Sequence, residues 1–172
     1  MQKNIFCPDA SRKYFLLKPH HFLDYLYDLG VDYRHDGEEN PNGNKNAELC
    51  RMFIDGKIDK IRFTPFVDDI CMPCKKLANG KRCVDYFDDE TTLYYGYRYK
   101  NDFNYQLDLK LNEVLPDVFD FDKVWDMFEV LSELEKTLTK EIVGLYKWQR
   151  PERIEKTFLG IKKGIEIYGK GN

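Results

Sequence analysis

Three cysteines within thirteen residues constrain the fold of this chain more than any other feature of its sequence. Cys71 and Cys74 form a Cys-x-x-Cys pattern, and Cys83 follows across an Asn-Gly turn. Thiolates at this spacing can bind one metal centre, and the turn allows the third thiolate to fold back toward the first two. The cysteines lie on a polar segment that also carries Pro and Gly, not on an apolar face. The sequence therefore predicts a metal-binding loop over residues 68–83.

Four basic residues lie beside these cysteines, at Lys75, Lys76, Lys81 and Arg82. Positive charge lowers the pKa of a thiol and partly offsets the charge of a thiolate-bound metal centre. A thioredoxin-like redox pair is disfavoured, because that motif opens a helix and no amphipathic run follows here. Three ordinary thiols are the remaining alternative. The chain holds five cysteines in all, and an odd number argues against a disulfide framework.

A fourth ligand for such a site has to come from elsewhere in the chain. Cys50 is the obvious thiol, although its helical stretch also fits a buried structural cysteine. Cys7 directly precedes a proline near the start of the chain and carries little weight as a ligand.

Two adjacent histidines offer a different source of ligands. His20 and Asp24 are spaced i,i+4 and His21 and Asp24 are spaced i,i+3, so both pairs can share one face of a helix. Histidines with a carboxylate one turn away are a credible ligand set, or an acid and base set in which His20 or His21 is the proton donor. The alternative is a structural role, in which the histidines cap the helix or satisfy hydrogen bonds in the core.

The periodicity of apolar residues predicts helices and short strands in the first half of the chain. Pro65 would place its strand at the edge of a sheet, because proline cannot donate to a strand ladder. The expected elements are an apolar run at 14–17, a helix from His20 to Gly30, a polar loop at 34–46, a helix at 47–54 and a strand at 60–67.

The second half is predicted to be mainly helical. Apolar residues step by three or four over 124–145, which predicts one long helix, and Pro151 opens a last helix. Gly160 and Gly164 lie inside that last helix, where each costs about 1 kcal/mol relative to Ala, so close packing against a neighbour is expected.

Two segments stay ambiguous. The segment 91–99 suits a strand that packs its tyrosines on the core, or an exposed aromatic loop, and 104–115 fits either a strand or a helix. The predicted fold class is α+β: a small mixed domain with a cysteine-rich metal loop and a mainly helical C-terminal half. Residues 1–115 are expected to form the metal-binding α+β region, and 116–172 a helical region packed on it as one domain.

Charge and hydropathy limit the classes of partner. A net charge of −3 argues against a general nucleic-acid binder, and no apolar run approaches the roughly 18 residues that span a membrane. The first residues lack the apolar stretch of a signal peptide, so a cytoplasmic protein is expected. The acidic segment 117–135 is expected to pair with the basic segment 147–170, although the latter also suits an anionic partner. Tyrosines are interspersed with basic residues over 94–100, which leaves a nucleic-acid or protein adaptor as a further alternative.

Two motifs, read in order, suggest a family. The chain carries LKPHHFLD at 17–24 and DDICMPC at 68–74, followed by one more cysteine. This arrangement resembles the uncharacterised domain-of-unknown-function family twelve eighty-four, short bacterial and archaeal proteins thought to bind an iron–sulfur cluster. The resemblance covers about residues 15–87 and extends more faintly to 128, and the region after about 130 looks like an extension.

The resemblance implies that Cys71, Cys74 and Cys83 hold the cluster beside His20 and His21. The family has a cysteine where this chain has an aspartate, at position 24. Three arrangements then stay open: the position-24 carboxylate ligates the fourth iron, the thiol at position 50 does so, or that iron is open to water or a small molecule.

The predicted function is therefore binding of an iron–sulfur cluster, of the 4Fe-4S type, by the Cys-x2-Cys-x8-Cys loop and a fourth ligand. Four thiolates suit electron transfer, whereas an open iron suits Lewis-acid chemistry on a substrate. The partner would accordingly be a redox protein or a small molecule. The alternative is a structural zinc module that acts as an adaptor, because three cysteines with one histidine or aspartate also satisfy Zn²⁺. Whether the protein is an enzyme stays open, and it has no Gly-rich phosphate loop.

Overall fold

The computed structural model describes residues 12–38, 40–144 and 151–171. Strands β1 (Phe15–Leu17), β2 (Lys60–Phe63) and β5 (Val124–Asp126) form a mixed sheet in the order β1-β2-β5. Strand β2 runs parallel to β1 and antiparallel to β5. A separate two-stranded hairpin consists of β3 (Leu77–Ala78) and β4 (Arg82–Cys83).

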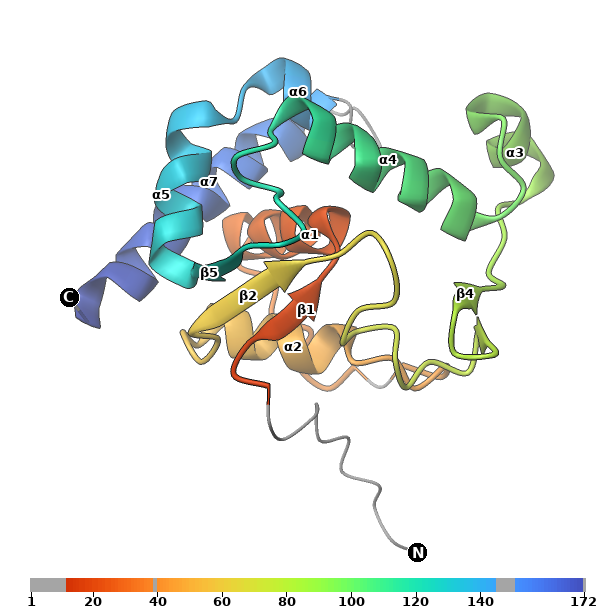
Figure 1. Ribbon diagram of the computed structural model, residues 1–172, viewed down its shortest axis with the longest axis horizontal. Helices are drawn as coiled ribbons and strands as arrows, with labels where there is room; N and C mark the ends of the chain where they lie inside the picture. Colours follow the sequence, from red (N-terminus) through yellow and green to blue (C-terminus); the bar gives the residue numbers. More distant parts are fainter. Residues whose placement is uncertain (1–11, 39, 145–150, 172) are drawn as a thin grey trace, which may run out of the picture.

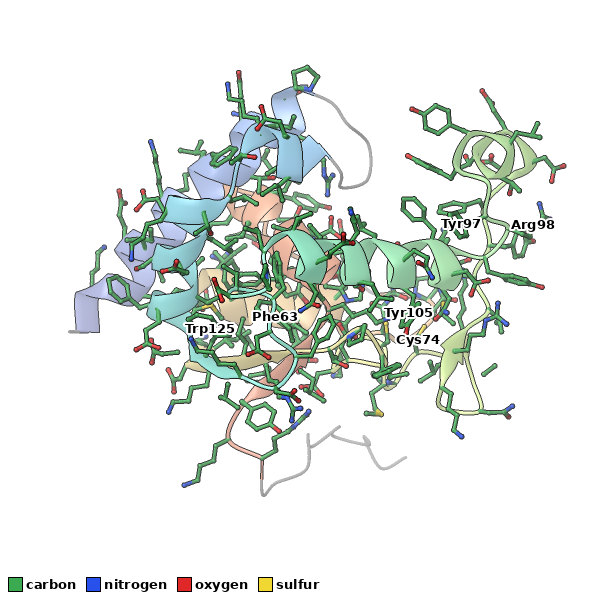
Figure 2. All side chains as sticks on the ribbon, turned by 45° about the horizontal axis from the view of Figure 1, so that its top comes forward. Phe63, Cys74, Tyr97, Arg98, Tyr105 and Trp125 are labelled. Carbon is green, nitrogen blue, oxygen red and sulfur yellow. The ribbon has the colours of Figure 1, made fainter. Side chains whose placement is uncertain are left out.

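Helices surround the sheet and dominate the second half of the chain, so the predicted α+β class is confirmed (Figure 1). One hydrophobic core joins residues of both halves, with Phe63 and Trp125 among them (Figure 2). The hairpin lies at the end of the molecule opposite α5 and α7. The helices are α1 (Pro19–Gly30), α2 (Asn46–Ile54), α3 (Asp89–Tyr95), α4 (Lys100–Val114), α5 (Met127–Thr137), α6 (Lys140–Gly144), α7 (Pro151–Tyr168) and the short 3-10 helix η1 (Gly169–Gly171).

The prediction that the strand near Lys60 lies at a sheet edge is wrong. Strand β2 ends at Phe63, before Pro65, and has partners on both sides. The proline therefore removes no ladder hydrogen bond, and the strand is free to be central.

The long helix predicted over 124–145 is divided into three elements. Residues 124–126 form β5, in which Trp125 pairs with Ile61 and its Nε1 donates to the Val118 carbonyl at 2.9 Å. Helix α5 starts after Asp126, whose carboxylate accepts from the Phe128 amide at 3.1 Å. The apolar spacing runs unbroken across this boundary, so periodicity alone could not detect the strand.

Helices α1 and α7 approach backbone to backbone at two glycines. A Cβ on Gly160 would lie 1.7 Å from the Leu26 carbonyl oxygen, and one on Gly30 would lie 1.9 Å from the Lys156 carbonyl oxygen. A Cβ on Gly164 would meet the Leu131 side chain of α5 at 3.0 Å. The expected close packing around Gly160 and Gly164 is therefore confirmed, and it fixes α7 against α1, which carries the histidine pair.

Both ambiguous segments prove to be helical in part. Residues 104–115 belong mostly to α4, so the helical alternative is correct there. The segment 91–99 is no strand: it forms the last part of α3, ended by Gly96 with φ of 74°, and then a turn into α4. Tyr97 packs on Phe103, whereas Tyr94 is 77% exposed, so the tyrosines do not all pack inward.

The described ion pairs of α7 run to the α1 region and not to the acidic segment 117–135. Arg153 pairs with Asp24, and Lys163 Nζ lies 2.6 Å from an Asp32 carboxylate oxygen. Helix α7 packs against both α1 and α5, and these two basic residues, Arg153 and Lys163, pair with acidic residues on the α1 side.

Candidate metal centre

One cavity, of about 300 Å³, brings together the residues that the two sequence motifs single out. All three cysteines of the loop line it, as do both adjacent histidines and the aspartate of α1. The convergence therefore joins two segments that lie about fifty residues apart in the sequence. These six lining residues are Cys71, Cys74, Cys83, His20, His21 and Asp24.

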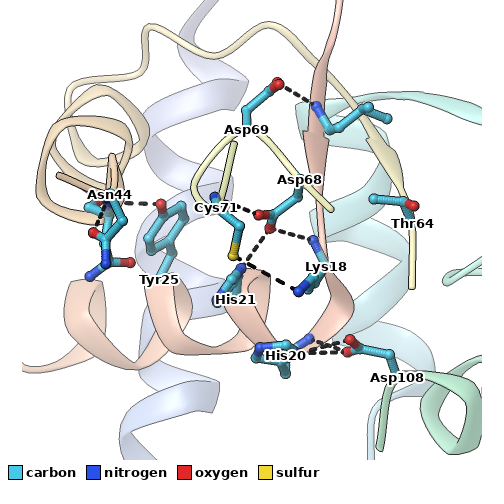
Figure 3. A network of polar contacts seen from close by, with 12 residues as sticks. Lys18, His20, His21, Tyr25, Asn44, Thr64, Asp68, Asp69, Cys71 and Asp108 are labelled. Carbon is cyan, nitrogen blue, oxygen red and sulfur yellow. Dashed lines mark hydrogen bonds and ion pairs between the residues drawn. The ribbon is translucent and has the colours of Figure 1, made fainter. Parts of the chain in front are cut away.

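Asp68 fastens the cysteine loop to the start of α1. Its fully buried carboxylate accepts from the Lys18 amide at 3.0 Å and lies 2.6 Å from His21 Nδ1 (Figure 3). The amide of Cys71 donates to the other carboxylate oxygen at 3.0 Å. One aspartate therefore orients a histidine and a cysteine of the candidate site at the same time.

Asp69, the next residue, attaches the cysteine loop to strand β1. The Leu16 amide donates to its carboxylate at 2.8 Å, and the Arg12 guanidinium forms an ion pair with it. The loop then turns tightly, since the Cys74 amide donates to the Cys71 carbonyl at 2.9 Å. The β3–β4 hairpin follows and returns Cys83 to the cavity, as the Asn-Gly turn predicted.

Asp108 of α4 holds the other histidine. It accepts from the His20 amide at 2.9 Å, which caps the first turn of α1, and lies 2.8 Å from His20 Nδ1. Each histidine of the pair is thus fixed through Nδ1 by a buried carboxylate. The His20 side chain is only 1% exposed, whereas that of His21 is 17% exposed.

Lys18 brings a buried positive charge to the cysteines. Its Nζ lies 3.9 Å from Cys71 Sγ. Burial and the Asp68 carboxylate raise the pKa of the Cys71 thiol, while Lys18 partly opposes them. Burial alone would raise the pKa of Asp68, but the charges of His21 and Lys18 lower it to about 2. The site thus keeps Asp68 ionised and the unligated Cys71 protonated at neutral pH.

The two candidates for a fourth protein ligand are placed differently. Asp24 lines the cavity and forms an ion pair with Arg153 of α7. Cys50 is buried in α2 and does not line the cavity; its Sγ lies 3.8 Å from an Asp28 carboxylate oxygen. Burial and that carboxylate raise the pKa of the Cys50 thiol. Cys7 lies outside the described residues.

Two groups of three donor atoms converge within 4.8 Å among the described residues. One consists of His21, Asp68 and Cys71 at the cavity. The other lies elsewhere and includes Cys50. Within the part of the chain that the structure describes, the three loop cysteines do not form such a group, so their sulfur atoms do not all lie within 4.8 Å of one another.

Sequence reasoning assigned no role at the site to Lys18, Asp68, Asp108 or Asn104. Lys18 and Asp68 belong to the two sequence motifs at 17–24 and 68–74, and their place in these motifs could have identified them as site residues. Asp108 stands between Leu107 and other apolar residues of α4, where a charged residue suggests a buried partner. The side-chain oxygen of Asn104, a cavity residue, is buried and accepts no hydrogen bond within the described residues.

Comparisons with protein-family models, with curated proteins and with solved structures found no match. Among the described residues, no helix is both long and apolar enough to cross a membrane.

Proposed function

We propose that the protein binds a 4Fe-4S cluster through Cys71, Cys74 and Cys83 and leaves the fourth iron open to the cavity. The observation that carries this proposal is that all three loop thiols line one cavity. The two other candidate ligands are engaged elsewhere, since Cys50 lies outside the cavity and Asp24 is held by an arginine.

The spacing of the thiols favours a cluster over a single zinc ion. Thiolates on one tetrahedral zinc lie about 3.8 Å apart, because each Zn–S bond is about 2.3 Å long. Among the described residues, the three loop thiols do not all lie within 4.8 Å of one another, as ligands of one zinc would. A cluster places a different iron behind each thiolate and therefore suits more widely separated thiols.

Polar groups around the cavity fit a thiolate-bound cluster. The Lys18 ammonium offsets the negative charge that thiolates bring into a buried site. Lys76 and Lys100 also line the cavity, although each is paired with Asp85, at 2.7 and 2.9 Å. Asn104 has a buried oxygen that can accept a hydrogen bond from a bound molecule.

An open iron, when the cluster is bound, supplies a Lewis acid toward a small molecule in the cavity. The residues of the chain would bind and orient that molecule. Because Asp68 fixes His21 through Nδ1, the Nε2 atom is the position from which a proton would be transferred. His21 suits this role better than His20, since it is the more exposed of the two.

Anaerobic purification tests the proposal through the iron, sulfide and zinc contents and the absorption spectrum of one sample. We expect about four irons per chain and a broad band near 400 nm, the mark of thiolate-bound iron. Cys71→Ser and Cys74→Ser should lose the iron, whereas Cys50→Ser and Cys7→Ser should retain it. Loss of iron from Cys50→Ser would overturn the open-iron arrangement, and one zinc per colourless chain that Cys71→Ser loses would favour the structural zinc module.

A further inference from the structure

We propose that Asp28, His35 and Cys50 form a second site, which binds a single divalent transition-metal ion such as Zn²⁺. Their donor atoms all lie within 4.8 Å of one another. None of the three lines the cysteine cavity, so this site shares no residue with the proposed cluster site.

Three different elements bring the donors together. Asp28 lies near the end of α1, Cys50 lies on α2, and His35 lies in the loop between these helices. His35 Nε2 lies 3.0 Å and Cys50 Sγ lies 3.8 Å from the same carboxylate oxygen of Asp28. Ligands of a tetrahedral zinc lie about 3.3 to 3.8 Å apart, because its bonds are about 2.0 to 2.3 Å long. The spacing and the mixed N, O and S donors therefore suit zinc.

The surroundings of His35 prepare it as a ligand. Its Nδ1 lies 2.8 Å from a Glu38 carboxylate oxygen, and such a bond fixes the tautomer in which Nε2 is the metal-binding nitrogen. The residue has a φ of 55°, in the left-handed region that non-glycine residues rarely adopt. Arg51 of α2 donates to its carbonyl at 2.7 Å and holds this conformation. An uncommon backbone conformation held by its neighbours is typical of functional positions.

The partial exposure of this site allows an ion to enter from solvent. The side chains of His35 and Asp28 are 12% and 15% exposed, while Cys50 supplies its thiol from the core. Three protein ligands leave the fourth position of a tetrahedral ion to water.

Titration of metal-free full-length protein with Co²⁺ tests this site in a Cys71→Ser/Cys74→Ser parent, where the loop no longer offers a set of thiols and cobalt–thiolate absorption reports Cys50. We compare this parent with the same protein carrying His35→Ala or His21→Ala, the matched control at the other site. We expect the first cobalt equivalent to bind at least tenfold more weakly in His35→Ala and unchanged in His21→Ala. Glu38→Gln, which weakens the acceptor at Nδ1 and also changes the acceptor of the Tyr33 hydroxyl, should weaken binding by about 10- to 100-fold.

The outcomes separate this site from the cluster. His35 lies on a loop, so His35→Ala should retain the wild-type circular dichroism even if a change at the buried Cys50 disturbs folding. Equal cobalt affinity and equal thiolate absorption in the parent with and without His35→Ala would overturn the proposal. The iron content of His35→Ala should equal that of wild type, so failure at one site can be recognised independently of the other.

Discussion

Asp68 is the residue on which the candidate site depends most. It connects the backbone of the cysteine loop, the backbone at the start of α1 and the imidazole of His21. A buried carboxylate with three charged or polar partners is stable only while it is ionised. The function of this residue is therefore to position ligands, and its contribution should be visible in the stability of the metal-free protein.

The first prediction concerns pH and Asp68. Its pKa is lowered from 3.8 to about 2, so its stabilising contribution is complete above pH 3.8 and is lost as the pH falls through about 2. We expect the free energy of unfolding of metal-free protein to fall by about 2 kcal/mol over that interval because of this group. Urea unfolding between pH 5 and pH 2 measures the slope. Asp68→Asn should reduce it, and an unchanged slope in that variant would contradict the assignment.

The second prediction concerns the position where the chain departs from the family that it resembles. Asp24→Cys should supply a fourth thiolate to the proposed cluster, because position 24 lines the cavity. We expect cluster assembly with iron retained on mild oxidation, whereas wild type should lose its open iron. Iron content and electron paramagnetic resonance before and after oxidation measure this. Asp24→Ala is the control for the lost ion pair with Arg153, and equal iron loss in all three proteins would contradict the prediction.

At the scale of elements, the sequence indicated the parts but not all of their boundaries. The helix from His20 to Gly30 is nearly as predicted, because Pro19 suits its first turn and the apolar stripe is regular. The strand at Val124–Asp126 could not be foreseen, since pairing with β2 is a long-range interaction. The same limit applies to the site: spacing predicted the cysteines and histidines, whereas Asp108 comes from a distant helix.

The third prediction concerns the contact of α1 with α7. Gly160→Ala should destabilise the protein by about 3 kcal/mol or more, because its Cβ would overlap the Leu26 carbonyl and the helices would have to separate. Gly144→Ala is the matched control, since its Cβ meets no atom within 4 Å, and it should be neutral or slightly stabilising. Urea unfolding of both variants measures the difference. Equal stability of the two would show that the helices do not pack this closely.

At the scale of the whole molecule, the candidate site depends on the packing of the entire fold. Asp68 and Asp69 attach the cysteine loop to β1 and α1, and Asp108 attaches α4 to the same helix. Helix α7 in turn fixes α1 through Gly160. A group bound by the loop thiols would therefore stabilise the folded state as a unit, since the unfolded chain cannot assemble the cavity.

The last prediction follows from this coupling. Removing the bound metal from anaerobically purified protein should lower the temperature of unfolding by several degrees, because a ligand that binds only the native state stabilises it by mass action. Cys74→Ser should lose the part of this shift that belongs to the cysteine loop and should respond to the chelator only through the proposed mononuclear site. Differential scanning calorimetry with and without chelator measures both effects. His35→Ala, altered only at the proposed mononuclear site, should keep the part of the shift that belongs to the cysteine loop; a shift abolished by His35→Ala and preserved in Cys74→Ser would assign the stabilising metal to Asp28, His35 and Cys50 instead.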